Sequence, residues 1–310
     1  MSGPRTVQQV GALAAALVVV SLLSGCVPPT ATTGGGSLSA TRTVVSHVHA
    51  IDVDDVRERV TIATHDGLIE IDISAGFEGS AAATVLGEYR GDVMGFVRAD
   101  DRFLVSGHPP AGADAPANVG VLAVGLDAKS WEPLALSGEV DFHAMSRDAS
   151  GSNSLIAGLD SVSGAVLSSD DGGISWASGV AIAARDIAVV PGGGALVVTT
   201  ELGLQISTDR GTTWSPIEGA PVLVLLGAGA TTNGESAVLG VGVDGALHRS
   251  ADGREWAAPT DLPFFPEALG VSERGVIVIA NTERVLMSID GGSTWSQIAD
   301  LTRALVVPGS

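Results

Sequence analysis

The chain of 310 residues contains one cysteine, one tyrosine and six histidines, and it has 16 basic residues against 35 acidic ones. A single cysteine excludes a disulfide within the chain, so stability must come from the burial of apolar side chains. The net charge of −19 argues against a nucleic-acid partner, because such binding depends on lysine and arginine neutralising phosphates. An acidic surface instead favours solubility and attracts cations.

One apolar run lies near the N-terminus, and it is shorter than a membrane-spanning helix requires. Arg5 precedes this run, VGALAAALVVVSLL (10–23), and small residues follow it up to Cys26. A basic, an apolar and a small-residue region in this order predict a signal peptide over residues 1–25. The segment LSGC (23–26) resembles the lipobox of bacterial lipoproteins. That resemblance implies that Cys26 becomes the first residue and carries the lipid chains of a membrane anchor.

A tether and one folded domain are expected after the signal peptide. Residues 26–42 are rich in Pro, Gly, Ser and Thr and have nothing to bury, whereas residues 43–310 are long enough to form a core. The mature chain would keep 15 basic and 35 acidic residues, a net charge of −20. We therefore expect a lipid-anchored monomer on the outer face of the cytoplasmic membrane, with a metal ion or an envelope protein as its candidate partner.

A repeat that ends in tryptophan accounts for all five tryptophans of the chain. Four segments fit Ser-x-Asp-x-Gly-x-Ser/Thr-Trp or a version one residue shorter, and GLDAKSW (125–131) keeps the Asp-to-Trp spacing of the short version. Successive tryptophans are 45, 38, 42 and 39 residues apart. A period near 40 residues with several short strands is the size of one four-stranded propeller blade. The Asp and Trp positions of the four segments are Asp171 and Trp176, Asp209 and Trp214, Asp252 and Trp256, and Asp290 and Trp295.

These segments resemble Asp-box (BNR) repeats, which occur in sialidases and in many unrelated propellers. The resemblance implies an all-β propeller, for which we predict six blades in preference to seven. In such repeats the Asp accepts hydrogen bonds from the amides of the turn between the third and fourth strands, and the Trp packs against its neighbours. The box residues are therefore predicted to be structural. The segment RALVVP (303–308) is expected either to close the ring or to begin a lost blade.

Five of the six histidines fall on one face of the predicted disc. The first strand of a blade begins, and its second strand ends, on the same face. Blade 1 places three histidines at such strand ends, and blades 2 and 3 place one each. Neutral imidazole suits zinc and copper, and methionine sulfur favours copper(I). We therefore predict a shared metal site, copper before zinc, with the ligands His47, His49, His65, His108, His143 and Met94.

Two carboxylates next to these histidines are predicted to orient the imidazole rings. Asp66 follows His65, and Asp141 lies two residues before His143. A fold-back of blade 2 is expected to place His108 beside Met94. Five segments also resemble a bacterial family of exported Asp-box propellers that is usually labelled glycosyl-hydrolase-like. They are HVHAID (47–52), ATHDGL (63–68), MGF (94–96), SGHP (106–109) and DFHAM (141–145). This resemblance implies no established activity.

A glycosyl hydrolase is the first alternative to metal binding, and an assembly or scaffold factor is the second. A sialidase of the resembled kind needs a tyrosine nucleophile, an acidic acid/base and three arginines that hold the substrate carboxylate. The one tyrosine, Tyr89, is predicted to lie near the outer strand of blade 1, away from the axis. A glycosidase with two carboxylates is still an alternative, because carboxylates occur near several strand ends: Asp66, Asp92, Glu139 and Asp141.

Overall fold

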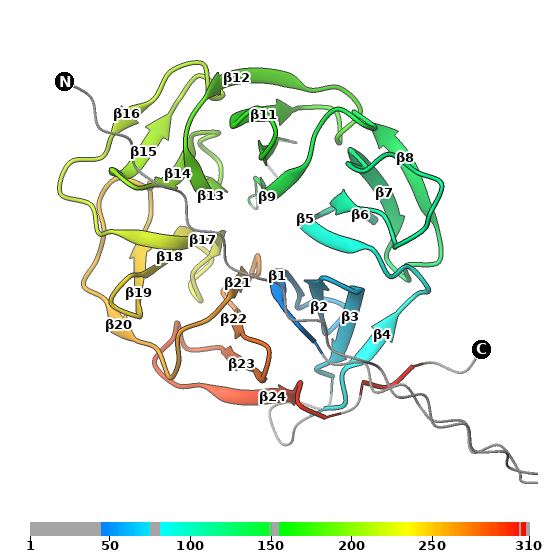
Figure 1. The fold of residues 1–310 in the computed structure, drawn as a ribbon. Helices are drawn as coiled ribbons and strands as arrows, with labels where there is room; N and C mark the ends of the chain where they lie inside the picture. The colour runs from blue at the N-terminus through cyan, green and yellow to red at the C-terminus, as the bar shows by residue number, and fades with distance from the viewer. Residues whose placement is uncertain (1–44, 75–80, 149, 151–154, 304, 308–310) are drawn as a thin grey trace, which may run out of the picture. The chain divides into compact units, whose positions relative to one another are not determined.

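In the computed structural model, six four-stranded β-sheets form a ring around a central axis (Figure 1). The structure describes residues 45–74, 81–148, 150, 155–303 and 305–307. Every regular element within these ranges is a strand. The described ranges contain no helix long and apolar enough to cross a membrane. The predicted signal peptide, the tether and Cys26 lie outside the described residues.

Each sheet is one blade, and its four strands follow one another along the chain. Neighbouring strands within a blade are antiparallel, so a short turn is enough to join them. This arrangement is the predicted six-bladed propeller. Blades 1 to 3 consist of β1 (Val48–Asp54), β2 (Arg59–Thr64), β3 (Gly67–Asp72) and β4 (Thr84–Leu86); β5 (Asp92–Ala99), β6 (Arg102–His108), β7 (Val121–Gly125) and β8 (Trp131–Ala135); and β9 (Phe142–Arg147), β10 (Ile156–Asp160), β11 (Ala165–Ser169) and β12 (Ala177–Ala181).

The middle strands of a blade are buried on both sides, because the blades pack face to face. They therefore contain nearly continuous apolar runs in place of an alternating pattern, and four of the five residues of LVVTT (196–200) are buried. Blades 4 to 6 consist of β13 (Ala184–Val189), β14 (Leu196–Thr200), β15 (Gly203–Ser207) and β16 (Ser215–Pro216); β17 (Leu223–Ala230), β18 (Ser236–Gly242), β19 (Ala246–Ser250) and β20 (Thr260–Asp261); and β21 (Ala268–Val271), β22 (Ile277–Ala280), β23 (Arg284–Ser288) and β24 (Ser296–Asp300).

The apolar core is divided into six clusters, one at each interface between neighbouring blades. Five of these clusters each contain one tryptophan, which packs against the blade before its own. Trp214 of blade 4, for example, packs with Leu155 and Val166 of blade 3. The tryptophans thus act between blades, as predicted for the box residues. The five interface tryptophans are Trp131, Trp176, Trp214, Trp256 and Trp295.

The interface between blades 6 and 1 contains no tryptophan among its described residues, and the C-terminal segment packs there. Leu301 is fully buried in this cluster, and Leu305 packs against it. The backbone N–H of Val306 donates to the carbonyl of Ala83, and Val306 in turn accepts from the N–H of Val85. Among its described residues, the segment RALVVP therefore closes the ring, with Val306 in a parallel bridge to Thr84 of the outer strand of blade 1. It does not begin a seventh blade.

Each Asp box forms the turn between the third and fourth strands of its blade. Asp171 Oδ1 accepts hydrogen bonds from the backbone N–H groups of Ile174 and Ser175, at 3.1 and 2.9 Å. The hydrogen bonds from Ser175 hold the pKa of Asp171 at about 2, well below its usual range. Asp209, Asp252 and Asp290 accept equivalent bonds. These carboxylates are tied into turns at the protein surface and are unavailable for catalysis.

Candidate metal centre

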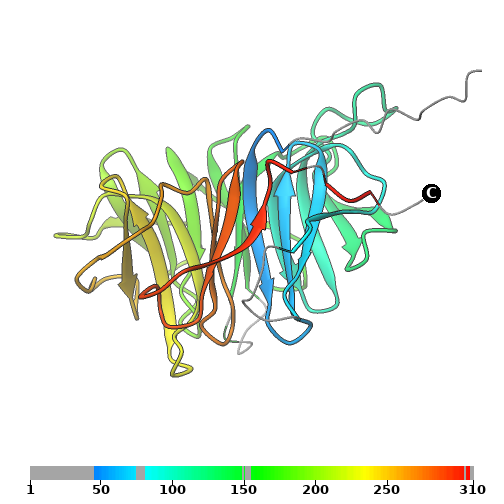
Figure 2. The ribbon, with the colours of Figure 1, turned by 90° about the horizontal axis from the view of Figure 1, so that it is seen from below.

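The face of the disc on which the innermost strands begin carries the predicted histidines. The six innermost strands surround the axis, and each runs from one face of the disc to the other (Figures 1 and 2). A central cavity of about 310 Å³ lies between these strands. His47, His49 and His143 line it at one end, and Arg98 and Arg147 line it at the other. The segment that joins β6 to β7 rises from the histidine face (Figure 2).

Three imidazoles from the first hairpin of blade 1 pack against one another. The ring centroids of His47 and His49 are 4.6 Å apart, those of His49 and His65 are 4.6 Å apart, and those of His47 and His65 are 5.5 Å apart. The hairpin pairs Val48 with Thr64 but Ala50 with Ala63, which leaves His49 as the extra residue of a β-bulge. A bulge re-aims a side chain, and here the His49 ring lies between the other two.

The carboxylate of Asp92, which opens β5 of blade 2, lies against this histidine cluster. Asp92 Oδ1 is 3.1 Å from His49 Nε2, and Asp92 Oδ2 is 2.8 Å from His65 Nδ1. Burial works against ionisation of Asp92, but its contacts with His49 and His65 outweigh burial and lower its pKa. His49 Nε2 and Asp92 Oδ1 are both buried, and neither has a hydrogen-bond partner among the described residues. This pair is the least satisfied polar contact of the cluster.

His47 joins the histidine cluster to blade 6. Its Nδ1 is 2.9 Å from Glu267 Oε2, which also accepts a hydrogen bond from the backbone N–H of Val48. Burial lowers the pKa of His47, and so do the nearby rings of His49 and His65, whereas Glu267 acts in the opposite direction. Because Nδ1 donates to a carboxylate, Nε2 is the nitrogen that carries the lone pair in the neutral ring.

A second group forms between blades 2 and 3 from His108, Asp141 and His143. Asp141 Oδ2 lies 2.8 Å from His143 Nε2 and 3.7 Å from His108 Nε2, and it accepts a 2.8 Å hydrogen bond from Ser161 Oγ. The hydrogen bond to Asp141 raises the pKa of His143. Burial opposes ionisation of Asp141, but the hydrogen bonds from His143 and Ser161 lower its pKa overall.

The structure thus divides the predicted ligands into two groups of three. In each group one ligand atom from each residue lies within 4.8 Å of the others; the groups are His49, His65 and Asp92, and His108, Asp141 and His143. His47 lies beside the first group. The shared site predicted for all five histidines and Met94 stays a prediction, because these groups record only which ligand atoms lie within 4.8 Å of one another.

Met94 and Asp66 are placed differently from their predicted roles. A bulge makes Met94 the extra residue between Val93 and Gly95, so His108 pairs with Asp92 in the sheet, and Met94 lines the central cavity. Asp66 is exposed, and the carboxylate that contacts His65 is that of Asp92. Asp92 was predicted only as a candidate glycosidase carboxylate, although its position at a strand opening beside His108 was readable from the sequence.

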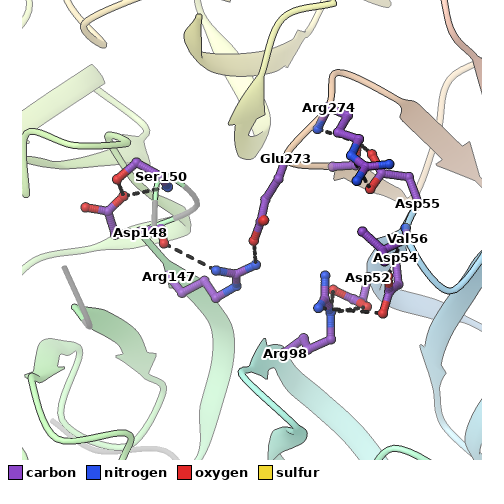
Figure 3. Close-up of polar contacts among 11 residues, drawn as sticks. Asp52, Asp54, Asp55, Val56, Arg98, Arg147, Asp148, Ser150, Glu273 and Arg274 are labelled. Carbon is purple, nitrogen blue, oxygen red and sulfur yellow. Dashed lines mark hydrogen bonds and ion pairs between the residues drawn. The ribbon is translucent and has the colours of Figure 1, made fainter. Parts of the chain in front are cut away.

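Ion pairs line the opposite end of the cavity (Figure 3). Arg98 Nε lies 3.0 Å from Asp52 Oδ2, and Arg98 also approaches Asp54 at 3.6 Å. Arg147 pairs with Glu273. Burial raises the pKa of Asp52, and Arg98 works against this shift. Because Arg98 and Arg147 are already neutralised by carboxylates, they are poorly placed to grip the carboxylate of a substrate.

Comparison with known proteins supports the propeller fold and identifies one Asp-box repeat. The family model described as BNR/Asp-box repeat matches residues 205–216, and no curated protein sequence matches the chain. A chain of the nidogen/laminin complex is 10% identical with a TM-score of 0.57, covering 80% of this chain and 96% of that one. The calcium-binding protein regucalcin from Agrobacterium tumefaciens is 10% identical with a TM-score of 0.51, covering 80% and 83%.

A glycoside hydrolase is also among the similar structures. The GH74 xyloglucanase from Xanthomonas campestris is 17% identical with a TM-score of 0.49, and the match covers 83% of this chain and 46% of that one. At such identities the likeness shows a propeller fold and nothing about substrate. The function must therefore be argued from the side chains of this chain.

Proposed function

We propose that this propeller binds a transition-metal ion, copper before zinc, through His49, His65 and Asp92 with His47 beside them. The contact between His49 Nε2 and Asp92 Oδ1 carries the proposal. Two ligand atoms that each lie about 2.0–2.1 Å from one ion, at an angle of about 100°, are about 3.1 Å apart. This is the separation of the two buried, unpartnered atoms. A cation between them would satisfy both.

The donor set favours a transition metal over calcium. Regucalcin is described as calcium-binding, but calcium takes six to eight oxygen ligands, whereas imidazole nitrogens dominate this group. Among divalent ions, copper binds nitrogen and oxygen sites more tightly than zinc. The proposed preference for copper therefore rests on imidazole and carboxylate ligands and no longer on the sulfur of Met94. We further propose that the protein is exported, lipid-anchored at Cys26, and acts in metal binding, sensing or delivery.

Tyr89 is a poor candidate for a glycosidase nucleophile. Its ring stacks on Trp131, with centroids 4.0 Å apart, and its O–H donates to the carbonyl of His108 at 3.1 Å. Burial, with a smaller contribution from Asp92, raises its pKa to about 12. A nucleophilic tyrosine needs the opposite shift. The geometry therefore favours metal binding over sialidase chemistry.

Equilibrium dialysis of the metal-free protein against copper(II) tests the proposal with two matched substitutions. Asp92→Asn keeps the shape of the side chain but removes its charge, and we expect it to lower the bound copper by about one equivalent. Asp66→Asn makes the same change at an exposed position outside the group of His49, His65 and Asp92, and it should bind as much copper as the wild type. Zinc should bind more weakly at the same site, and calcium should not compete. Equal copper uptake by the two variants would contradict the proposal.

A further inference from the structure

The group between blades 2 and 3 has its own unsatisfied buried atom. Only 4% of the surface of Asp141 is exposed. Its Oδ2 accepts hydrogen bonds, but its Oδ1 is buried and has no hydrogen-bond partner among the described residues. A buried carboxylate oxygen without a donor is costly, because it has lost its water and gained nothing in exchange. A cation that contacts both carboxylate oxygens would remove that cost, and His108 and His143 approach this carboxylate at Oδ2.

His108 is oriented as a metal-ligating histidine would be. Its Nδ1 lies 2.9 Å from the backbone carbonyl of Ala117, an atom that can only accept a hydrogen bond, so Nδ1 carries the proton. In the neutral ring Nε2 then carries a lone pair, and it lies 3.7 Å from Asp141 Oδ2. In that state two acceptor atoms face each other, and a cation can bridge them. Histidine ligands of metals are held in this way by a carbonyl or a carboxylate on the second nitrogen.

The surrounding backbone and side chains fix Asp141 and leave His143 accessible. The N–H of Asp141 donates to Asp160 Oδ1 at 2.9 Å, and Ser161 Oγ donates to Asp141 Oδ2. The His143 side chain is 42% exposed, so an ion from solvent can reach this group. Two ligands on opposite sides of one ion are about 4.1 Å apart at bond lengths of about 2.0–2.1 Å, and the observed separations of 2.8 and 3.7 Å fall below this limit. The shorter one is the hydrogen bond from His143 Nε2, whose proton a bound ion would displace.

We propose that His108, Asp141 and His143 form a second metal site, which binds a divalent zinc-class ion separately from the site at His49, His65 and Asp92. Two imidazoles and one carboxylate are a ligand set used for zinc and for other divalent transition metals. Three protein ligands leave at least one coordination position for water or for an exchangeable ligand. The proposal does not depend on the first site, because the two groups have no residue in common.

Cobalt(II), a spectroscopic probe for zinc sites, tests this second site by stoichiometry and by visible absorption. The wild type should bind about two equivalents, Asp92→Asn and Asp141→Asn about one each, and the double variant about none. His143→Ala is the second test variant, because its ring is exposed to solvent and the substitution leaves Asp141 in place. Circular dichroism and thermal melts in chelator would confirm that every variant is folded.

The pattern of losses distinguishes the two proposals. If Asp141→Asn and His143→Ala each lose one equivalent and Asp92→Asn loses none, the second site stands and the proposed function fails. If Asp92→Asn alone loses an equivalent, the second site is wrong. A wild type that binds a single equivalent, which either Asp variant abolishes, would also overturn the second site, because one ion would then be shared by both groups.

Discussion

Near the start of β13, Asp186 lines the central cavity, and its carboxyl group is held by backbone hydrogen bonds. It accepts hydrogen bonds from the backbone N–H groups of Ile187 and Leu226, at 2.8 and 2.7 Å. Burial nevertheless raises its pKa to about 6, and these bonds and the nearby Arg185 oppose the shift only in part. The hydrogen bond from Leu226 to Asp186 therefore joins blade 5 to blade 4. Because the carboxyl group is buried, its ionisation lowers the free energy of unfolding as the pH rises.

The sign of this effect follows from the two pKa values. The pKa of Asp186 is higher in the folded protein than the ordinary value of 3.8, so the unfolded chain releases its proton first as the pH rises. The stability that this carboxyl contributes is complete below about pH 4 and is lost as the pH passes through about 6. Between about pH 4.5 and pH 7.5 the loss should be about 2 kcal/mol.

Asp186→Asn should remove this pH dependence. Asn cannot ionise, although it accepts only through one oxygen and so weakens one of the two backbone hydrogen bonds. The free energy of unfolding is measured in urea for the wild type and the variant at about pH 4.5 and at about pH 7.5. The value for the wild type minus that for the variant should be about 2 kcal/mol lower at the higher pH. Contributions from the other ionisable groups cancel in this difference. A difference that is independent of pH would show that Asp186 keeps an ordinary pKa.

At the scale of elements, the box tryptophans explain why similar blades stack into a ring. Five tryptophans serve five of the six blade interfaces, and the sixth interface is filled by the C-terminal segment, including Leu301 and Leu305. The first and last blades do not share a sheet, so this segment and the bond between Val48 and Glu267 supply contacts across the closure. The histidine cluster lies at this same closure, because His47 also contacts Glu267.

The tryptophans differ in whether the indole N–H group has a hydrogen-bond acceptor, and so they should contribute unequally to the stability of the fold. Trp176 Nε1 donates to the carbonyl of Gly173 at 2.9 Å, whereas Trp214 Nε1 is buried without a hydrogen-bond partner among the described residues. Replacement by Phe removes a satisfied donor from the first site and an unsatisfied one from the second. We expect Trp176→Phe to destabilise by about 1 kcal/mol more than Trp214→Phe, as measured by urea unfolding. Equal losses would mean that the donor of Trp176 contributes nothing to stability.

At the scale of the whole molecule, the net charge and the predicted membrane anchor both bear on the proposed binding of metal ions. A net charge of −19 raises the local concentration of cations around the protein, which suits a metal ligand and opposes an anionic one. Lipid attachment at Cys26 would keep such a binding surface close to the membrane, with the tether of residues 26–42 allowing it to move. Both features are expected from the sequence, and Cys26 lies outside the described residues.

Cys26→Ser should release the protein from the membrane fraction, because serine cannot receive the thioether-linked lipid of the proposed anchor. Fractionation of cells with an immunoblot measures this, and mass spectrometry of the N-terminus shows whether the signal peptide was removed. The comparison is informative only for cleaved protein, since an uncleaved signal can itself hold the chain in the membrane. Cleaved Cys26→Ser protein that still sediments with membranes would contradict the lipid anchor.

The sequence by itself determined the fold class and the role of the boxes, and it favoured six blades over seven. Each of these depends on local chemistry that repeats: a turn that needs Asp and Gly, a tryptophan four or five residues after the Asp, and short strands at a period near 40 residues. Strand order alone also placed five histidines on one face, because the beginning of a first strand and the end of a second strand share that face.

Only the tertiary structure decided which histidines meet. The bulges at His49 and Met94 change which side chains face a neighbour, and a period of two residues cannot predict them. Asp92 and Glu267 come from blades 2 and 6, and they reach the histidines of blade 1 only after the ring has closed. The division into two groups depends on contacts between blades, which are long-range in sequence. A repeat pattern fixes each blade but does not fix the side chains that two blades bring together.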